Sequence, residues 1–304
     1  MSDRVLAMAV LALFGLLFGS FANVMIWRFP RGESLSYPGS HCPKCDAPIA
    51  WFDNVPVLSW LALHGMCRTC AAPIAIRYPL AQLTSGALWL AAGLRFGVSF
   101  QTAAAVFFFY LLMILAFIDL DTMRLPNPLV ALLAAIGLVG AASSQLSHVQ
   151  AVPLLSSGGL FGASPLASAV GGALVCAVPA LMLSVVMSAI LKRPALGMGD
   201  VKLLGVIGIF IGAYGLLALF VGSLLGVLFG VARSRSRTPK VFSEEGDASV
   251  KGSRGAAGSD DMTTCELRGA SKPFPFGPAL ALGAVIATLV GPQLWTWYQS
   301  LFMV

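Results

Sequence analysis

Residues 101–121 read QTAAAVFFFYLLMILAFIDLD, an apolar run that ends in two aspartates, Asp119 and Asp121. No residue before Asp119 in this stretch is charged. The length of the run is close to the roughly 20 apolar residues that a helix needs to cross the hydrocarbon core of a membrane. The stretch therefore predicts a membrane-spanning helix with carboxylates at one end.

The composition of the whole chain agrees with this interpretation. Hydrophobic residues make up 58% of the 304 residues, and charged residues only 11%, whereas a soluble domain has roughly 25% charged residues. This composition excludes a soluble globular protein and a disordered one. The apolar runs are long and continuous, which excludes a transmembrane β-barrel with its short alternating strands. The predicted fold class is an all-α polytopic membrane protein.

We expect about eight transmembrane helices. The apolar segments are 5–27, 79–94, 101–118, 128–143, 167–190, 201–213, 215–231 and 277–300. The first is longer than the apolar region of a signal peptide and is followed by Arg28 and Arg31, so we expect it to be retained as a span. The stretch 232–276 is polar and of low complexity, which is typical of a flexible loop. No internal repeat is apparent.

The basic residues predict the orientation of the chain. If the N-terminus lies outside, the inside segments and their flanks hold 17 of the 19 Lys and Arg residues, and only Arg4 and Arg95 lie outside. Those inside segments are 28–77, 119–127, 191–200 and 232–276. Basic residues concentrate in cytoplasmic loops. We therefore expect a periplasmic N-terminus, and we attribute the net charge of +6 to these loops in contact with the lipid bilayer, not to nucleic acid.

Four cysteines in the segment 28–77 predict a metal site. Cys42 and Cys45 form one C-x-x-C pair, and Cys67 and Cys70 form another. Two such pairs can complete a tetrahedral zinc shell. Disulfides are the alternative, but they are rare in the cytoplasm, where the charge pattern places this segment. Because the set has no open position, the zinc is expected to be structural and not catalytic.

Carboxylates also stand at the predicted cytoplasmic ends of two spans. Asp119 ends the span 101–118, and Asp200 follows Gly197-Met-Gly just before the span 201–213. Ionisable residues at such positions are functional candidates because their burial is costly. The alternative is that they cap helices or are solvated, and Asp200 is well placed to be a simple N-cap.

A pair of carboxyl groups on the same side of the membrane favours acid–base chemistry. Two facing carboxyl groups cannot both ionise easily, so one can act as a general acid while the other activates water for peptide hydrolysis. Gly197 and Gly199 would let a substrate backbone approach Asp200 closely. The sequence contains neither G-x-S-x-G nor H-E-x-x-H, so it offers few other hydrolytic sets.

The order of these motifs resembles that of the type IV prepilin peptidases, also called prepilin leader peptidase/N-methyltransferases, a family of GxGD-type intramembrane aspartic proteases. The resemblance covers nearly the whole chain. It includes both cysteine pairs, both aspartate motifs, and the stretches 19–24, 28–30, 51–60, 77–80 and 275–278.

The resemblance implies that Asp119, seven residues before Pro126, and Asp200, the aspartate of GxGD, are catalytic. The supporting residues are then Asp121, Lys202, Gly197 and Gly199. Lys202 would bind the substrate or bias Asp200 toward ionisation, or else be an interfacial charge with no special role. The implied reactions are removal of the leader from type IV prepilins or type II secretion pseudopilins at the cytoplasmic face of the bacterial inner membrane, then N-methylation with S-adenosylmethionine.

Two features depart from the family pattern. Gln82 stands where the family often has Glu, which leaves the methyltransferase half in question. The loop 232–276 is longer and more polar than expected. The alternatives are a GxGD protease without methyltransferase activity and a transporter that uses Asp119 and Asp200 as a proton relay, although a relay predicts acids nearer mid-membrane.

These expectations divide the chain into five parts. Residues 1–27 form the first transmembrane helix, 28–77 a cytoplasmic four-cysteine loop domain, 78–231 the transmembrane aspartic protease core, 232–276 a flexible cytoplasmic loop, and 277–304 the last transmembrane helix.

Overall fold

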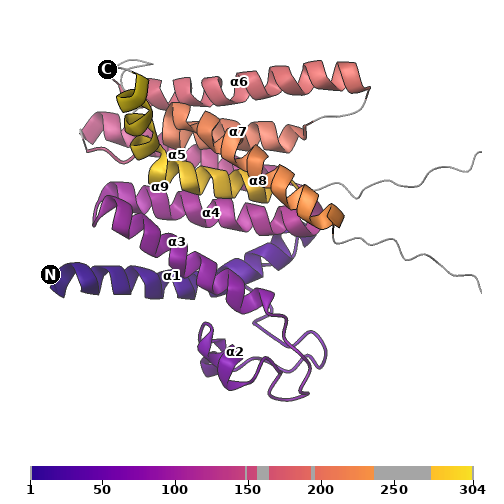
Figure 1. The fold of residues 1–304 in the computed structure, drawn as a ribbon. Helices are drawn as coiled ribbons and strands as arrows, with labels where there is room; N and C mark the ends of the chain where they lie inside the picture. Colours follow the sequence, from indigo (N-terminus) through magenta and orange to yellow (C-terminus); the bar gives the residue numbers. More distant parts are fainter. Residues whose placement is uncertain (1, 148, 156–163, 193–195, 236–274, 303–304) are drawn as a thin grey trace, which may run out of the picture.

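The computed structural model describes residues 2–147, 149–155, 164–192, 196–235 and 275–302. Within these segments, eight long helices form a bundle (Figure 1). They are α1 (Ser2–Arg28), α3 (Arg77–Phe96), α4 (Phe100–Thr122), α5 (Asn127–Ser147), α6 (Pro165–Leu191), α7 (Met198–Ile211), α8 (Gly215–Arg235) and α9 (Gly277–Phe302). Each of the eight predicted spans corresponds to one of these helices, which confirms the all-α polytopic class.

Six helical segments are long and apolar enough to cross a membrane. They are Asp3–Arg31, Phe100–Thr122, Asn127–Ser147, Pro165–Leu191, Met198–Leu228 and Gly277–Leu301. The fifth of them joins α7 to α8 through the short 3-10 helix η3 (Gly212–Tyr214). α3 is the remaining long helix, and it is more polar because it carries Arg77, Gln82 and Arg95. The chain is therefore a multi-pass membrane protein.

α4 is a deeply buried helix and positions the first aspartate. It lies between α3 on one side and α5 and α9 on the other (Figure 1). Its side chains Phe108, Phe109, Leu112 and Leu115 are fully buried, and the ring of Phe108 stacks on that of Phe210 in α7 at 4.4 Å between centroids. The last turn of this helix contains Asp119, so the aspartate is held by a well-packed element of the bundle.

Glycines bring two other helix pairs into backbone contact. A Cβ atom on Gly172 of α6 would lie 2.3 Å from the carbonyl oxygen of Gly208 in α7. A Cβ atom on Gly283 of α9 would lie 2.3 Å from the carbonyl oxygen of Ala218 in α8. Small residues at helix interfaces are typical of membrane proteins. These contacts fix α7 and α9, whose first residues reach the candidate site.

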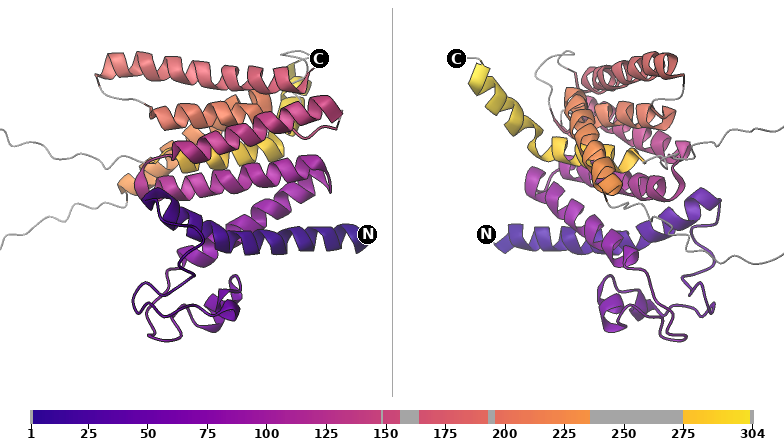
Figure 2. Two further views of the ribbon diagram at one scale, coloured as in Figure 1. Left: turned by 180° about the vertical axis from the view of Figure 1, so that it is seen from behind. Right: turned by 45° about the vertical axis from the view of Figure 1, so that its right-hand side comes forward.

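The residues between α1 and α3 form a small lobe beside the bundle (Figures 1 and 2). We call residues 29–76 the cysteine lobe. It contains the 3-10 helices η1 (Phe29–Arg31) and η2 (Trp51–Asn54) and the short helix α2 (Leu58–Ala62). Most of the predicted loop 232–276 lies outside the described residues, which stop at 235 and resume at 275.

Candidate active site

Asp119 lies in the last turn of α4 and is almost completely buried, with 6% of its surface exposed. Its Oδ2 accepts a hydrogen bond of 3.0 Å from the backbone N–H of Gly277, the first residue of α9. A Cβ atom at position 277 would lie 2.7 Å from the same Oδ2. Only glycine allows this approach without displacing the carboxyl group, so α9 completes the surroundings of Asp119.

Asp200 lies in the first turn of α7, where its carboxyl group interacts electrostatically with that of Asp119. The N-cap residue of this helix is Gly197 and Asp200 is the third helical residue, so Asp200 is not itself the N-cap, although its carboxyl group accepts a hydrogen bond from the backbone N–H of Gly197. A Cβ atom on Gly197 would lie 3.1 Å from Oδ2 of Asp200. The structure thus brings together the two aspartates that the sequence singled out, from helices α4 and α7.

Gly199 allows the start of α7 to pack against the turn that follows Asp119. A Cβ atom on Gly199 would lie 3.3 Å from the side chain of Leu125. Met123, which ends α4, adopts a left-handed conformation with φ of 52°, and this redirects the chain toward α5. The turn and the start of α7 are therefore in close contact.

Asp121 makes a different contact from that of Asp119. Its Oδ1 accepts a hydrogen bond of 2.5 Å from Nη1 of Arg77, the first residue of α3, in an ion pair whose side chains are about one-third exposed. Arg77 also lies over the ring of Phe117, 5.5 Å from its centroid. Asp121 therefore ties the end of α4 to the start of α3.

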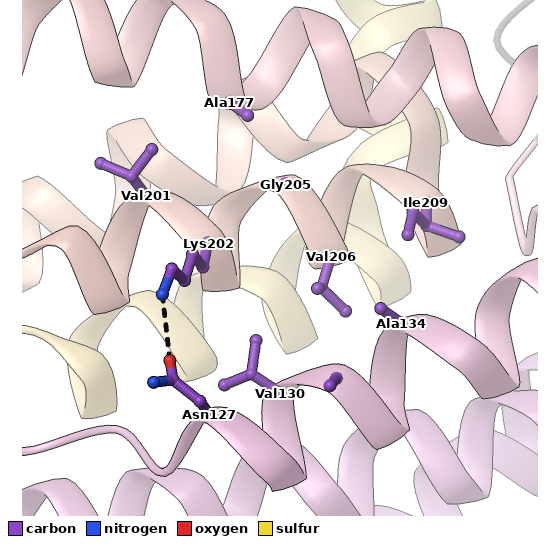
Figure 3. A pocket seen from close by; sticks show the side chains of 10 residues that line it. Asn127, Val130, Ala134, Ala177, Val201, Lys202, Gly205, Val206 and Ile209 are labelled. Atoms are coloured by element: carbon purple, nitrogen blue, oxygen red, sulfur yellow. Dashed lines mark hydrogen bonds between the residues drawn. The ribbon is translucent and has the colours of Figure 1, made fainter.

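Lys202 points into a groove between α5, α6 and α7 (Figure 3). Its Nζ donates a hydrogen bond of 3.1 Å to Oδ1 of Asn127, the first residue of α5. Residues two apart on a helix lie on nearly opposite faces, and in the described part of the chain Lys202 forms no ion pair with Asp200. The groove has a volume of about 420 Å³ and is otherwise apolar, lined by residues such as Val130, Ala134 and Val206.

The aspartate pair has the arrangement that acid–base chemistry on water requires. Two carboxyl groups from different helices interact at one end of the bundle, and one of them is nearly excluded from solvent. Carboxyl groups in such a pair share a proton, so that one donates and the other accepts. The arrangement can therefore support aspartic-type hydrolysis.

The four cysteines of the cysteine lobe form the second candidate site. Their Sγ atoms all lie within 4.8 Å of one another, and those of Cys42 and Cys70 are 3.8 Å apart. Zn–S bonds of about 2.3 Å in a tetrahedron require S···S distances of about 3.8 Å. All four are free thiols, so the geometry fits a metal ion and not the alternative of disulfides.

The backbone around Cys42 and Cys67 stabilises the thiolate forms of these two residues. The N–H groups of Lys44 and Cys45 point at the sulfur of Cys42 and lower its pKa to about 6. The N–H groups of Cys70 and Thr69 lower the pKa of Cys67 in the same way. Thiolates are the ligand form of cysteine, so Cys42 and Cys67 are prepared for a cation. The backbone N–H of Ala47 lowers the pKa of Cys45, but contacts with the sulfur atoms of Cys70 and Cys42 outweigh this effect and raise that pKa to about 12.

The two cysteine pairs belong to a short repeat that the sequence analysis missed. Residues 42–49 read CPKCDAPI and residues 67–74 read CRTCAAPI. Each turn is closed in the same way: Cys42 N–H donates to the carbonyl oxygen of Ala47 at 3.0 Å, and Cys67 N–H to that of Ala72 at 2.9 Å. The shared C-x-x-C-x-A-P-I spacing was the signal that could have revealed it.

Sequence reasoning also missed three residues that position the site. Arg77, Asn127 and Gly277 contact Asp121, Lys202 and Asp119, and all three are the first residues of helices. All three lie within stretches that the sequence singled out, but their partners are 44, 75 and 158 residues away in sequence. No local spacing could have indicated those pairings.

Comparisons with known proteins identify the chain by two family models. Residues 13–96 match the bacterial peptidase A24 N-terminal domain, and residues 106–231 match the type IV leader peptidase family. The first range covers most of α1, the cysteine lobe and α3, and the second covers both aspartates. α9, which contributes Gly277, lies beyond both ranges.

Several curated relatives carry the name prepilin leader peptidase/N-methyltransferase. The protein of Bacillus subtilis (strain 168) is 32% identical over 292 residues, which cover 96% of this chain and 97% of the relative. That of Aeromonas salmonicida (strain A449) is 31% identical over 318 residues, covering 95% and 92%. That of Myxococcus xanthus (strain DK1622) is 37% identical over 229 residues, covering 73% and 63%. No solved structure matches the chain.

Proposed function

Because the chain belongs to the type IV leader peptidase family, we propose that it is a membrane aspartic endopeptidase. It removes the leader peptide from type IV prepilins or type II secretion pseudopilins and then methylates the new N-terminal residue. The names of its relatives combine these two activities. The observation that carries the protease half is that the end of α4 with Asp119 and the start of α7 with Asp200 lie at the same end of the bundle, where Gly199 packs against Leu125.

Asp119 and Asp200 divide the roles of general acid and general base. The ionised carboxyl group accepts a proton from water as the water oxygen attacks the scissile carbonyl carbon. The protonated carboxyl group donates its proton as the peptide C–N bond breaks and the new amine leaves. The close packing around Gly197, Gly199 and Gly277 leaves the two groups little freedom to separate.

Cys42, Cys45, Cys67 and Cys70 hold a structural zinc ion. Their sulfur geometry and thiolate-stabilising backbone support this assignment. A four-cysteine shell leaves no ligand position open, so the ion stabilises the fold of the cysteine lobe and takes no part in hydrolysis.

S-adenosylmethionine is the methyl donor that the methyltransferase activity requires. The groove in Figure 3 does not fit it, because its walls are apolar and the ammonium group of Lys202 would repel a cationic sulfonium. We assign no residue of this chain to the methyl donor.

The orientation follows from the basic residues. The aspartates and the ends of α1 and α4 share a side with Arg28, Arg31 and Arg77. Because basic residues concentrate on the cytoplasmic side of a membrane, this supports a cytoplasmic location of that side, in a bacterial inner membrane, and a periplasmic N-terminus. The division at 1–27, 28–77, 78–231, 232–276 and 277–304 then separates a cytoplasmic zinc-binding segment and loop from the membrane core.

Incubation of the purified, detergent-solubilised protein with a prepilin tests both activities. We expect mass spectrometry to show leader removal, and labelled S-adenosylmethionine to transfer its methyl group to the product. Leader removal without transfer of the labelled methyl group would mean that the protein is a protease without methyltransferase activity. Absence of cleavage by well-folded protein with several prepilins and pseudopilins would contradict the proposal.

A further inference from the structure

The short helix α2 of the cysteine lobe exposes two large apolar side chains. Leu58 is 65% exposed and Leu61 is 57% exposed, and they lie one turn apart on the same face. The opposite face is packed into the lobe, since Trp60 donates from Nε1 to the carbonyl oxygen of Ile74 at 3.1 Å. The leucines therefore point outward because the helix is anchored by its other face.

Two hydrogen bonds fix the height of this helix along the membrane-spanning helices. The hydroxyl of Ser20 donates to Oδ1 of Asn54 at 3.3 Å, and the N–H of Val57 donates to Oε1 of Gln82 at 2.8 Å. Ser20 lies eight residues before the end of α1, about 12 Å from it along the axis. Gln82 lies five residues after the start of α3, about 7.5 Å along that axis.

These offsets place α2 beside α1 and α3 at a position nearer to the middle of the membrane than the end of α1 and the start of α3. Trp27 and Arg31 stack at the end of α1, 3.6 Å from ring centroid to guanidinium carbon, and aromatic and basic side chains of this kind mark the membrane–water interface. All three views show α2 on the side of the cysteine lobe that faces the N-terminal end of α1 (Figures 1 and 2). The helix that carries the two exposed leucines thus lies nearer to the hydrocarbon than the end of α1 does.

We propose that Leu58 and Leu61 insert into the lipid interface of the cytoplasmic leaflet and anchor the cysteine lobe flat against the membrane. Apolar side chains on the membrane-facing side of an interfacial helix bind the boundary between headgroups and acyl chains. The occupant of this surface is lipid because the lobe is tethered at both ends to spanning helices and its anchoring turn is bonded to their flanks.

A photocrosslinking experiment on the full chain tests this anchor. The variant Leu61→p-benzoylphenylalanine is reconstituted in vesicles of phosphatidylethanolamine and phosphatidylglycerol, irradiated and analysed by mass spectrometry. Tyr37→p-benzoylphenylalanine is the matched control, because Tyr37 is 79% exposed in the same lobe. It precedes Pro38, whose carbonyl oxygen is held at 2.8 Å by Arg28 at the very end of α1.

We expect at least tenfold more lipid adduct at position 61 than at position 37. Equal adducts at the two positions, no lipid adduct at position 61, or adducts at 61 with protein alone would overturn the proposal. If the position 61 variant does not fold, Leu58→p-benzoylphenylalanine carries the same expectation and the same contrary outcomes. The result is independent of whether the protein cleaves prepilins.

Discussion

The backbone N–H of Gly277 donates a 3.0 Å hydrogen bond to Oδ2 of Asp119, which lies 158 residues earlier in the chain. This bond joins the last helix of the bundle to the aspartate at the end of α4. The bond also joins a residue inside the region that the family model matches to one outside it, since that match ends at residue 231. The C-terminal helix is therefore part of the site and not an additional anchor.

The substitution Gly277→Ala should reduce cleavage on the order of 10²-fold, because a Cβ atom 2.7 Å from Oδ2 must displace Asp119, and small misplacements of catalytic groups have effects of this size. The measurement is kcat/KM for a prepilin peptide. Gly226→Ala in α8 is the control, since its Cβ atom would meet Phe276 at an ordinary 3.7 Å. Equal activity of the two variants would show that the approach of Gly277 is not required.

Asp121 should prove to be a positioning residue. Asp121→Asn removes one partner of an ion pair with Arg77 whose side chains are about one-third exposed, and exposed pairs contribute about 0.2–1 kcal/mol. We expect kcat/KM to fall less than about tenfold, with activity restored when Arg77→Asp is combined with Asp121→Arg. Complete loss of cleavage in Asp121→Asn, without recovery in the charge-reversed double variant, would assign Asp121 to the chemistry instead.

Gln82 should act as a hydrogen-bond acceptor, whatever the charge at that position. Val57 has a positive φ of 62°, which is strained for a β-branched residue, and its N–H is held by Oε1 of Gln82. Gln82→Leu leaves this N–H without its acceptor, at a cost of about 1–3 kcal/mol, so residues 51–60 should become more sensitive to limited proteolysis. Gln82→Glu keeps an acceptor oxygen and should match the wild type.

If Gln82→Glu were as sensitive to proteolysis as Gln82→Leu, the acceptor role would be wrong. The same two variants bear on the methyltransferase half. An acid at this position that served methyl transfer would raise labelling of the product in Gln82→Glu while leaving the proteolysis pattern unchanged.

Removal of one thiolate should release the metal. We expect purified wild type to contain one zinc ion per chain, and Cys42→Ser to lose most of it, because the remaining three sulfurs cannot complete the tetrahedral shell. Elemental analysis gives the zinc content. Cys176→Ala, at a buried cysteine in α6 far from this cluster in sequence, is the control and should keep its zinc. Unchanged zinc in Cys42→Ser would place the metal elsewhere.

Much of the fold could be predicted because each membrane span is a continuous apolar run in the sequence. The run at 101–118 and its closing aspartate correspond to α4 and Asp119 within a few residues. The cysteine cluster could also be predicted, since the spacing within each C-x-x-C pair brings its two sulfur atoms close together. In both cases the signal lies in neighbouring residues, and local chemistry determines the outcome.

The contacts between distant helices could not be predicted in this way. Nothing in the sequence around Lys202 indicates that it bonds to Asn127 instead of facing Asp200. That outcome depends on the rotation of α7 against α5, which the close approach of Gly137 in α5 to Ile209 and Phe210 in α7 helps to set. The depth of the cysteine lobe beside α1 and α3 likewise depends on tertiary hydrogen bonds.

The most direct test of the central claim is cleavage of a prepilin by the variants Asp119→Asn and Asp200→Asn, each compared with wild type in detergent. An amide keeps the shape of the side chain but cannot transfer a proton. Each variant should therefore lose cleavage on the order of 10²–10⁴-fold while inserting and purifying like the wild type. Cleavage at a rate close to wild type in either well-folded variant would contradict the assignment of the aspartate pair as the catalytic centre.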